Sequence, residues 1–306
     1  MTGRSWPAVG VVLPTHDRPE LMRKSLRAIV GQDYPGVVET VVVFDRSEPD
    51  REIVRDDDRR PVRVMANARA PGLSGARNTG ILDLGTDYIA FCDDDDVWLP
   101  GKLEEQITTL DGHPDAEFAS CGIVVQFGDH DSVRLAGAGE VTYRDLLRSR
   151  MSMLHSSTFL ARRASLVDGI GLLDEDIPGS QNEDYDLLLR AAKRHPIMVA
   201  DVPLVRVLWA DSYFSRRWET KVASLQWMLA RHPDLTTDPV GSARIFGQLA
   251  FAYACLHDRR MARRWAGRSL RANWREPRAV FALAVSAHLV SGETILRALH
   301  RHGRGV

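Results

Sequence analysis

The chain has 306 residues, of which 44% are hydrophobic, and a formal net charge of −1. That length suits one large domain or one domain with an appendage, and the composition is that of an ordinary globular protein. No apolar run reaches the length of a transmembrane helix, and the apolar segment near the N-terminus is too short for a signal peptide. The three cysteines lack metal-ligand spacing, so we expect them to be reduced core residues of a cytoplasmic protein.

Charge is unevenly distributed along the chain. Residues 241–306 hold 12 arginines and 3 acidic residues, which is a net charge of +9. The remaining 28 basic and 38 acidic residues give residues 1–240 a net charge of −10. An acidic body followed by a basic tail indicates two functional regions.

Short β-branched apolar runs alternate with helical patterns over the first hundred residues. Pro19 lies in the first turn of the first helical pattern, and Pro35 lies beyond its end. Strands are predicted at 8–14, 38–45, 62–67 and 87–93, and helices at 15–35 and, after a glycine-rich turn, within 72–85. This alternation predicts an α/β fold with a mostly parallel sheet flanked by helices, in which ligands bind beyond the carboxyl ends of the strands.

The second half of the chain is less regular until its last third. Weaker strand patterns occupy 117–129 and 155–164, a helix is predicted at 182–196, and one or two strands at 197–209. From about Ser215 the pattern is helical and contains an alanine-rich hairpin that resembles a single tetratricopeptide-like unit. One such unit cannot bury its faces alone, so we expect it to pack on the rest of the chain or on a second subunit.

The stretch "YIAFCDDDDVWLP" places four consecutive aspartates, Asp93 to Asp96, at the end of a predicted buried strand. Asp45 ends another strand, so both sites fall on the expected ligand edge of the sheet. Carboxylates held at a strand end favour hard divalent cations such as Mg²⁺ or Mn²⁺, which keep open positions for phosphates. The acidic residues at 56–58 lie in a polar stretch between strands and are interpreted as solvated surface.

Five segments occur in an order that resembles the family 2 glycosyltransferases of the GT-A fold, over about residues 8–210. They are "VVLPTHDR", "VVVFDRS", "GLSGARNTGI", "YIAFCDDDDVWLPGKLE" and "NEDYDLLLRA". The resemblance implies a Rossmann-like GT-A catalytic domain at 1–215, with a nucleotide-sugar half at about 1–100 and an acceptor half at about 101–215. A helical C-terminal region, 216–306, follows.

The resemblance also implies a reaction. A sugar passes from a nucleoside diphosphate to an acceptor hydroxyl, usually with inversion and with Mn²⁺ or Mg²⁺ as the cofactor. A divalent cation stabilises the charge that develops on the leaving diphosphate, and a carboxylate near the hydroxyl serves as general base.

The resemblance assigns the donor side of the site to the first strand, the second strand and the glycine-rich turn. Pro14, Thr15 and Arg18 match a segment that lines the base pocket. Asp45 matches the base-binding aspartate, although this chain has Phe44-Asp45 where the family usually has two aspartates. The segment that closes over the nucleotide contains Arg77 and Asn78.

The acidic run and the later helix supply the remaining roles. Asp95 is the expected metal ligand, with Asp93 and Asp94 approaching the ribose and diphosphate; the assignment within the run is open by one position. Asp184 matches the general base, with Glu183 adjacent to it. Alternatively, both carboxylates only favour the helix N-terminus through its dipole, which is worth about 0.3–1 kcal/mol.

Other residues allow two interpretations each. His155 is a structural polar residue or part of the wall on the acceptor side. Trp98 stacks on a sugar or belongs to the core. Trp209 and Asp211 follow the last strand, where the family often has a segment that covers the donor.

Three other functions remain open: a retaining transferase of the same fold, a nucleotidyltransferase and a non-catalytic scaffold. The nucleotidyltransferase is disfavoured because "PTHDRPE" lacks the glycine-rich loop expected after its first strand. The family favours uridine or thymidine donors, and the acceptor is a glycan, a lipid-linked glycan or a small glycoside. The basic helices are a solvated surface, a homodimer interface or a peripheral contact with lipid at the inner membrane face. Nucleic acid is not expected, because the acidic body would repel it.

Overall fold

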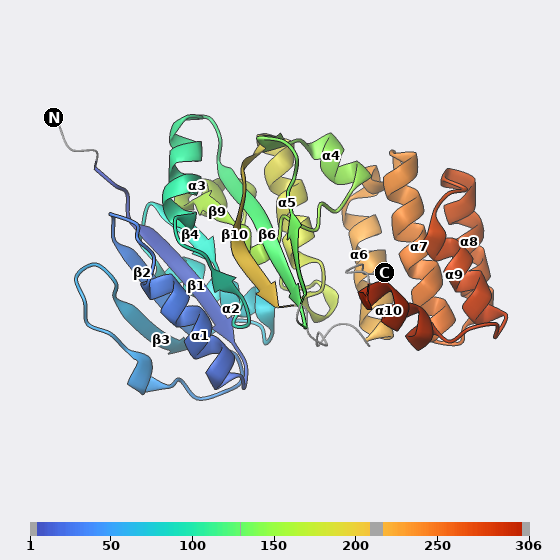
Figure 1. Ribbon diagram of the computed structural model, residues 1–306, viewed down its shortest axis with the longest axis horizontal. Helices are drawn as coiled ribbons and strands as arrows, with labels where there is room; N and C mark the ends of the chain where they lie inside the picture. The colour runs from blue at the N-terminus through green and yellow to red at the C-terminus, as the bar shows by residue number, and fades with distance from the viewer. Residues whose placement is uncertain (1–4, 129, 209–216, 302–306) are drawn as a thin grey trace. The chain divides into compact units, whose positions relative to one another are not determined.

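The computed structural model describes residues 5–128, 130–208 and 217–301, so Trp209 and Asp211 lie outside the described residues. Two compact units are present (Figure 1). The first comprises the described residues of 1–143, 151–175 and 183–209, and the second those of 144–150, 176–182 and 210–306. Two short segments of the chain's middle therefore belong to the second unit, which no sequence pattern indicated.

The first unit is an α/β structure. Its strands are β1 (Val9–Thr15), β2 (Val38–Phe44), β3 (Val62–Ala66), β4 (Tyr88–Phe91), β5 (Val97–Trp98), β6 (Phe118–Phe127), β7 (His130–Arg134), β8 (Glu140–Val141), β9 (Leu160–Arg162) and β10 (Ile197–Leu208). Its helices are α1 (Pro19–Val30), α2 (Leu73–Asp83), α3 (Lys102–Asp111) and α5 (Glu183–Arg194). Short helical turns lie at Arg51–Ile53, Ser156–Thr158 and Ser165–Ile170.

The described strands form one ten-stranded sheet with the main order β3-β2-β1-β4-β9-β6-β10-β5, while β7 pairs with β6 and β8 with β10. The first four strands are parallel, and β10 runs parallel to β6. By contrast, β9 is antiparallel to both β4 and β6. The predicted α/β class with helices flanking the sheet is confirmed, and the second half of the sheet is mixed.

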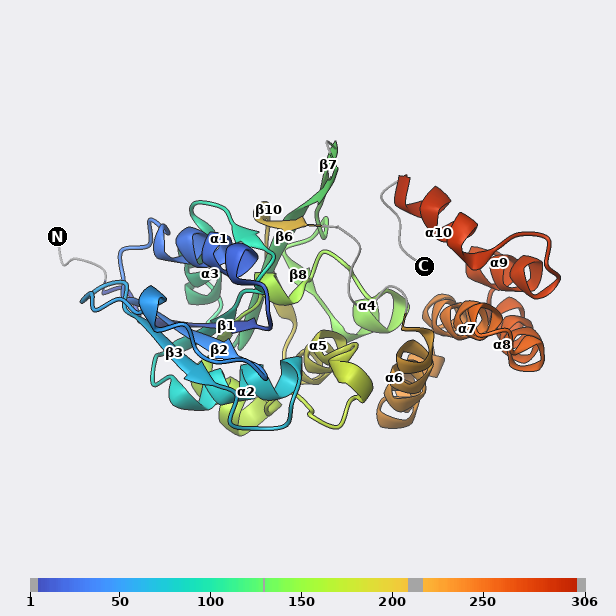
Figure 2. The same ribbon diagram turned by 90° about the horizontal axis from the view of Figure 1, so that it is seen from below.

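Helices cover both faces of the sheet (Figure 2). Val9, Val11 and Leu13 of β1 share one buried core with residues of α1 and α3. On the other face, a side chain at Gly80 of α2 would meet Val12 within 2.6 Å, so this glycine lets α2 lie directly on β1. Burial on both faces explains why β1 is a continuous apolar run.

The order in which the strands are added reverses at β1. The chain passes from β1 to β2 and β3 on one side, and then returns to β4 on the other side of β1. Open α/β sheets bind ligands at such a switch point, beyond the carboxyl ends of the strands. Thr15 at the end of β1 and the acidic run that follows β4 meet at this edge.

The second unit is helical. Its helices are α4 (Tyr143–Arg148), α6 (Trp218–Arg231), α7 (Pro239–Cys255), α8 (Arg259–Ala272), α9 (Pro277–Ser286) and α10 (Gly292–Arg301). The first residue of α4, Tyr143, belongs to the first unit. Short helical turns lie at Pro178–Ser180 and Pro233–Thr236. Asp238 and Asp258 cap α7 and α8, each accepting a hydrogen bond from the backbone of the first turn. None of the helices in the described parts of the chain is long and apolar enough to cross a membrane.

Candidate active site at the acidic strand end

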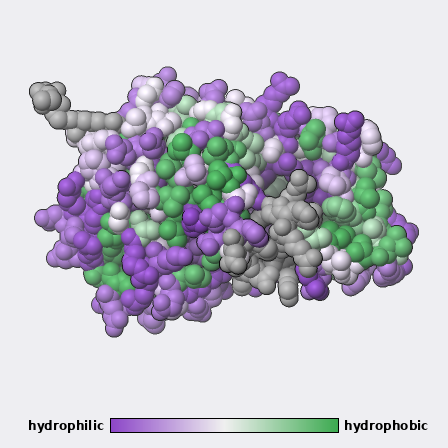
Figure 3. Space-filling model, viewed as in Figure 1, coloured by the Kyte–Doolittle hydropathy of each residue, from purple (hydrophilic) through white to green (hydrophobic). Residues whose placement is uncertain are grey.

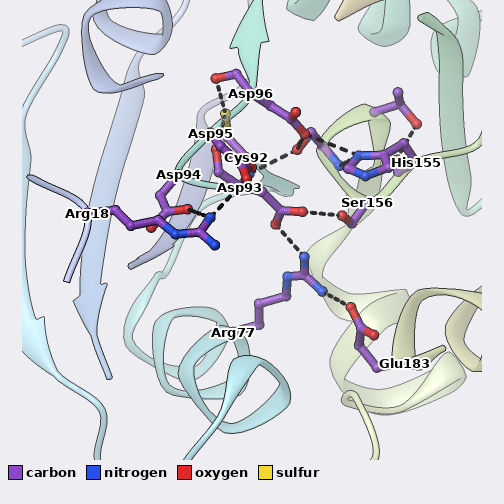
Figure 4. Close-up of polar contacts among 12 residues, drawn as sticks. Arg18, Arg77, Cys92, Asp93, Asp94, Asp95, Asp96, His155, Ser156 and Glu183 are labelled. Carbon is purple, nitrogen blue, oxygen red and sulfur yellow. Dashed lines mark hydrogen bonds and ion pairs between the residues drawn. The ribbon is translucent and has the colours of Figure 1, made fainter. Parts of the chain in front are cut away.

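The middle two aspartates of the run face the end of β1 and the start of α1 (Figure 4). The Thr15 hydroxyl donates a hydrogen bond of 2.9 Å to Asp94 Oδ2. Arg18 donates to Asp95 Oδ2 at 2.9 Å and lies 3.4 Å from Asp94 Oδ1. These contacts join the segments that follow β1 and β4, as the strand order requires. Pro14 lies in β1 opposite Val43 of β2.

The outer two aspartates face the turn at residues 155–158. Asp93 Oδ2 accepts a 2.7 Å hydrogen bond from the Ser156 hydroxyl. Asp96 is 1% exposed and accepts from the Ser157 hydroxyl at 2.5 Å, and His155 Nδ1 lies 3.2 Å from its carboxylate. The Ser157 hydroxyl also accepts from the backbone N–H of Asp93 at 2.9 Å. This turn therefore fixes both ends of the acidic run.

Arg77 connects the acidic run to α5. Its guanidinium is 1% exposed and donates to both Asp93 and Glu183, while the ring of Phe91 lies 5.7 Å from its central carbon. A buried guanidinium requires such carboxylate partners, because a lone charge would be strongly destabilised. The structure therefore assigns Arg77 a place beneath the site, between two carboxylates from different motifs.

Burial and like charges shift the pKa values of this cluster. Burial and the neighbouring charges of Asp96, Asp93 and Asp94 raise the pKa of Asp95 to about 7, although Arg18 opposes the shift. Burial and Asp184 raise the pKa of Glu183 to about 7 against the effect of Arg77. The site thus concentrates more negative charge than Arg18 and Arg77 neutralise, which favours a further cation.

The pKa of His155 is raised and that of Asp93 is lowered, so in both residues the charged form is favoured. Burial alone would lower the pKa of His155, but the charge and hydrogen bond of Asp96, together with Asp93, raise it to about 9. Burial would raise the pKa of Asp93, but Arg77, His155 and Ser156 lower it. A protonated His155 is therefore a hydrogen-bond donor to Asp96, which makes it a polar residue of the site wall.

Asp45 lies at the end of β2 and is held from several sides. Its carboxylate accepts hydrogen bonds from Asn67 Nδ2 at 2.9 Å, from the Gly72 N–H at 3.1 Å and from Arg46 Nε at 2.9 Å. Burial would raise the pKa of Asp45, but these three donors lower it. Asp45 is therefore held in its ionised form next to the end of β1, where its backbone N–H donates to the Thr15 carbonyl at 2.9 Å.

The glycine-rich turn before α2 depends on two of its glycines. Gly72 has a φ of 120°, a value that side chains rarely permit. A side chain on Gly75 would lie 1.9 Å from the carbonyl oxygen of Ala70. The turn can therefore fold over the start of α2 and bring the Gly72 N–H to Asp45.

Asn78 occupies a buried position in α2. Its amide donates to the carbonyl of Leu173 at 2.8 Å and to Glu175 at 2.7 Å, and accepts from the Leu173 N–H at 3.0 Å. It holds the loop at residues 173–175 in place. Contact of Asn78 with a nucleotide stays a prediction, because its polar atoms already have these partners.

Two sets of residues in the described chain are candidates for a metal. Ligand atoms of Asp93, Asp96 and His155 lie within 4.8 Å of one another. To bind a cation there, His155 would have to lose its proton, and the hydrogen bonds to Asp93 and Asp96 would have to break. The side chain of Asp95 is about a third exposed (35%), and its ion pair within the described residues is with the half-exposed Arg18. Asp95 is therefore the more accessible ligand.

Asp184 and Glu183 begin α5 but have different environments. Glu183 is 5% exposed, with its carboxylate against Arg77, whereas Asp184 is half-buried. Asp184 Oδ1 accepts from the backbone N–H of Tyr185 at 2.7 Å. Of the two carboxylates, Asp184 is the one that a substrate can reach.

Several residues of the site were not singled out from the sequence. Asp96, Ser156 and Ser157 form the hydrogen bonds that fix the acidic run. The consecutive polar residues of "HSST" within an apolar pattern were a signal, because buried hydroxyls require partners. Trp98 is 2% exposed and donates from its indole to the Ser157 carbonyl at 3.0 Å, so it belongs to the core.

Together, the α/β sheet and the acidic strand-end site define the class of transferases with the GT-A fold. The model of the family described as glycosyl transferase family 2 matches residues 10–169, which is about half of the chain. The chain belongs to this family of glycosyltransferases, so the family predicted from the five segments is confirmed.

Known proteins support the family and the fold. The chain is 29% identical over 102 residues to the UDP-Glc:alpha-D-GlcNAc-diphosphoundecaprenol beta-1,3-glucosyltransferase WfgD of Escherichia coli. That match covers 33% of this chain and 40% of WfgD, so the chain spans less than half of that relative. Among solved structures, TarS of S. aureus in complex with UDP has a TM-score of 0.58 at 16% identity, covering 92% of this chain and 90% of TarS. The mannosyltransferase PcManGT from Pyrobaculum calidifontis, in complex with GDP-Man and Mn²⁺, has a TM-score of 0.54 at 20% identity, covering 97% and 80%.

Proposed function

We propose that the protein is a metal-dependent, inverting glycosyltransferase whose general base is Asp184. The observation that carries the proposal is the difference in exposure between the two carboxylates at the start of α5. Glu183 is buried against Arg77, and Asp184 stays accessible beside the acidic run. An inverting transferase needs one accessible carboxylate on the acceptor side and a cationic platform under the leaving diphosphate.

The residues present fit a divalent cation, since four consecutive carboxylates follow β4 and the pKa of Asp95 is raised to about 7 by burial and its acidic neighbours. We assign Asp95 as the metal ligand, with Asp93 and Asp94 toward the ribose and diphosphate. Bound Mn²⁺ or Mg²⁺ would act as a Lewis acid that stabilises the leaving diphosphate. We assign Arg18 to the base pocket, and its guanidinium, which lies against Asp94 and Asp95, connects that pocket to the acidic run.

The reaction then follows from the chain's own groups. The acceptor oxygen attacks the anomeric carbon, and the bond from that carbon to the diphosphate oxygen breaks on the opposite face. Asp184 accepts the proton of the acceptor hydroxyl, and the bonding electrons leave with the nucleoside diphosphate. Asp45, ionised and fixed by three donors, is assigned to the nucleobase, with Pro14 and Thr15 beside it.

A uridine donor and a lipid-linked glycan acceptor are the substrate classes we favour. The name of WfgD specifies UDP-Glc and a sugar linked to diphosphoundecaprenol, and TarS was solved with UDP. We place the protein in the cytoplasm at the inner membrane face, where such acceptors carry their headgroups. A retaining transferase of the same fold is the second candidate.

The decisive experiment compares Asp184→Asn with the control Glu104→Gln. Both variants remove a carboxylate from the first turn of a helix, but Glu104 is exposed and lies in α3. UDP-glucose and other UDP-sugars serve as donors, a synthetic GlcNAc-diphospholipid as acceptor, and released UDP and the product anomer are measured. We expect Asp184→Asn to bind the donor normally and to lose transfer by about 10²–10⁴-fold, as for other general bases. Unchanged turnover would remove the base assignment, and retention of the anomeric configuration would favour the second candidate.

A further inference from the structure

Helix α8 has a face made of arginines. Arg259, Arg260, Arg263, Arg264, Arg268 and Arg271 are all exposed, and we call them the arginine face. The buried residues of the same helix are Ala262, Trp265, Ala266 and Ser269. At 100° per residue the arginines cover one half of the helix, and the buried residues lie on the other half.

The positive charge of this face is not neutralised within the described chain. Helix α8 contains no acidic residue, and none of the ion pairs formed by the described residues involves the arginine face. Asp258, the nearest carboxylate in the sequence, caps the helix by accepting from the Met261 N–H. Six guanidinium groups that form no ion pair within the described chain repel one another at this spacing. The surface therefore favours a polyanionic partner.

Exposed aromatic and aliphatic side chains follow α8 in the chain and occur on the helix that packs against it. Trp274, just beyond the end of α8, is 73% exposed, and the Arg275 guanidinium lies 5.0 Å from the centre of its ring. In α9, which packs against α8, Val280 is 54% exposed, and Leu289 beyond its end is 80% exposed. Hydrophobic side chains gather around α8 and α9 on the visible face of the helical unit (Figure 3). Exposed tryptophan and aliphatic residues beside arginines suit a surface with both charged headgroups and an apolar layer.

We propose that the arginine face of α8, with Trp274, binds the surface of a membrane that contains anionic lipids. The arginines would contact lipid phosphates, and Trp274 would enter the interfacial layer. A second copy of the chain is a poorer partner, because a two-fold interface would place the same positive face against itself. Nucleic acid offers phosphates but no apolar layer for Trp274, and residues 1–240 carry a net charge of −10.

The test measures co-sedimentation of the full chain with vesicles of phosphatidylcholine, with and without about 30% phosphatidylglycerol. We expect binding only to the anionic vesicles, and loss of most of it at about 0.5 M salt. The variant Arg260→Gln/Arg263→Gln/Arg264→Gln/Arg271→Gln should weaken binding by at least about tenfold, since each basic residue contributes separately. Arg268 is left unchanged because it stacks on Phe246 and Trp265 inside the helical unit.

The matched control removes four exposed positive charges elsewhere, in Lys24→Gln/Arg27→Gln/Arg51→Gln/Arg231→Gln. The control should bind anionic vesicles as strongly as the natural chain does. Both variants should have the same melting temperature as the natural chain. Trp274→Ala should weaken the binding that remains at high salt. The proposal would be overturned if the chain bound both kinds of vesicle equally, or if the control lost vesicle binding as much as the α8 variant did. It would also be overturned if a short DNA duplex displaced the chain from the vesicles, or if the α8 variant alone changed the chain from an oligomer to a monomer. Binding of the nucleotide-sugar donor is measured without vesicles, so a failure of the proposed transferase function is distinguished from a failure of membrane binding.

Discussion

Arg77 offers the sharpest test of how the site is held together. Its guanidinium is fully buried between Asp93 and Glu183, so Arg77→Met leaves the buried carboxylate of Glu183 and the half-buried carboxylate of Asp93 without it. Removing one partner from a buried ionic cluster typically costs about 3–5 kcal/mol of unfolding free energy. We expect a loss of that size at about pH 7.5, measured by urea unfolding in the presence of EDTA.

The matched control is Arg63→Met. Arg63 also bridges two carboxylates, those of Glu39 and Asp83, but its side chain is half-exposed. Solvent screens such a pair, so the control should cost less than about 1 kcal/mol. The difference between the two variants isolates the effect of burial from that of ion-pair geometry.

The loss in Arg77→Met should depend on pH in a defined direction. Even with Arg77 present, burial and Asp184 raise the pKa of Glu183 to about 7, and removing the guanidinium raises it further. A carboxyl group whose folded pKa lies above its unfolded value of about 4.3 binds more protons in the folded state, so stability falls as pH rises between the two values. The deficit should therefore be smaller at about pH 5.5 than at about pH 7.5.

A second substitution closes the cycle. Glu183→Gln in the Arg77→Met background removes one of the two unpaired charges, and it should restore about 1–3 kcal/mol. The explanation is refuted if Arg77→Met costs no more than Arg63→Met, or if its cost is the same at both pH values and the double variant recovers nothing.

Two further predictions concern the cation and a buried lysine. UDP should raise the melting temperature strongly only with Mn²⁺ or Mg²⁺; Asp95→Asn should abolish this increment and Glu104→Gln should keep it, whereas equal stabilisation with EDTA would contradict a metal at this site. Lys102 is fully buried over the Trp98 ring at 4.0 Å, and burial lowers its pKa to about 8. Because the folded state then binds fewer protons than the unfolded state between about pH 8 and 10.4, the unfolding free energy gains up to about 1.4 kcal/mol per pH unit in that window. Lys102→Met should lose this slope and the exposed Lys24→Met should keep it; equal slopes in urea unfolding would show that Lys102 is not the group.

The parts of the fold that the sequence predicted are those with local signals. Strands β1, β2 and β6 are buried on both faces and therefore appear as β-branched apolar runs. Strand β9 has three residues and pairs with β4 and β6, from distant parts of the chain, so the pattern at 155–164 revealed it only partly. The short strands β5 and β8 depend in the same way on pairing with β10 and had no pattern of their own.

The site was predicted as a set of motifs but not as a set of contacts. Their positions at strand ends predicted Asp45 and the acidic run at the ligand edge of the sheet, and the family resemblance added Asp184 as the general base. Whether Arg77 faces a nucleotide or a carboxylate depends on Glu183, which lies 106 positions away in the sequence. Such a pairing is decided by the packing of α2 against α5 and has no local sequence signal.

The outer two and the inner two of the four aspartates face different neighbours: the first and last contact the turn at residues 155–158, and the middle two contact Thr15 and Arg18. The acidic run therefore has a register, in the sense used for paired strands. Inserting or deleting one residue would present a carboxylate to the wrong partner at two or more positions while leaving the composition acidic. Lengthening or shortening the run should thus be more damaging than neutralising any one of its members.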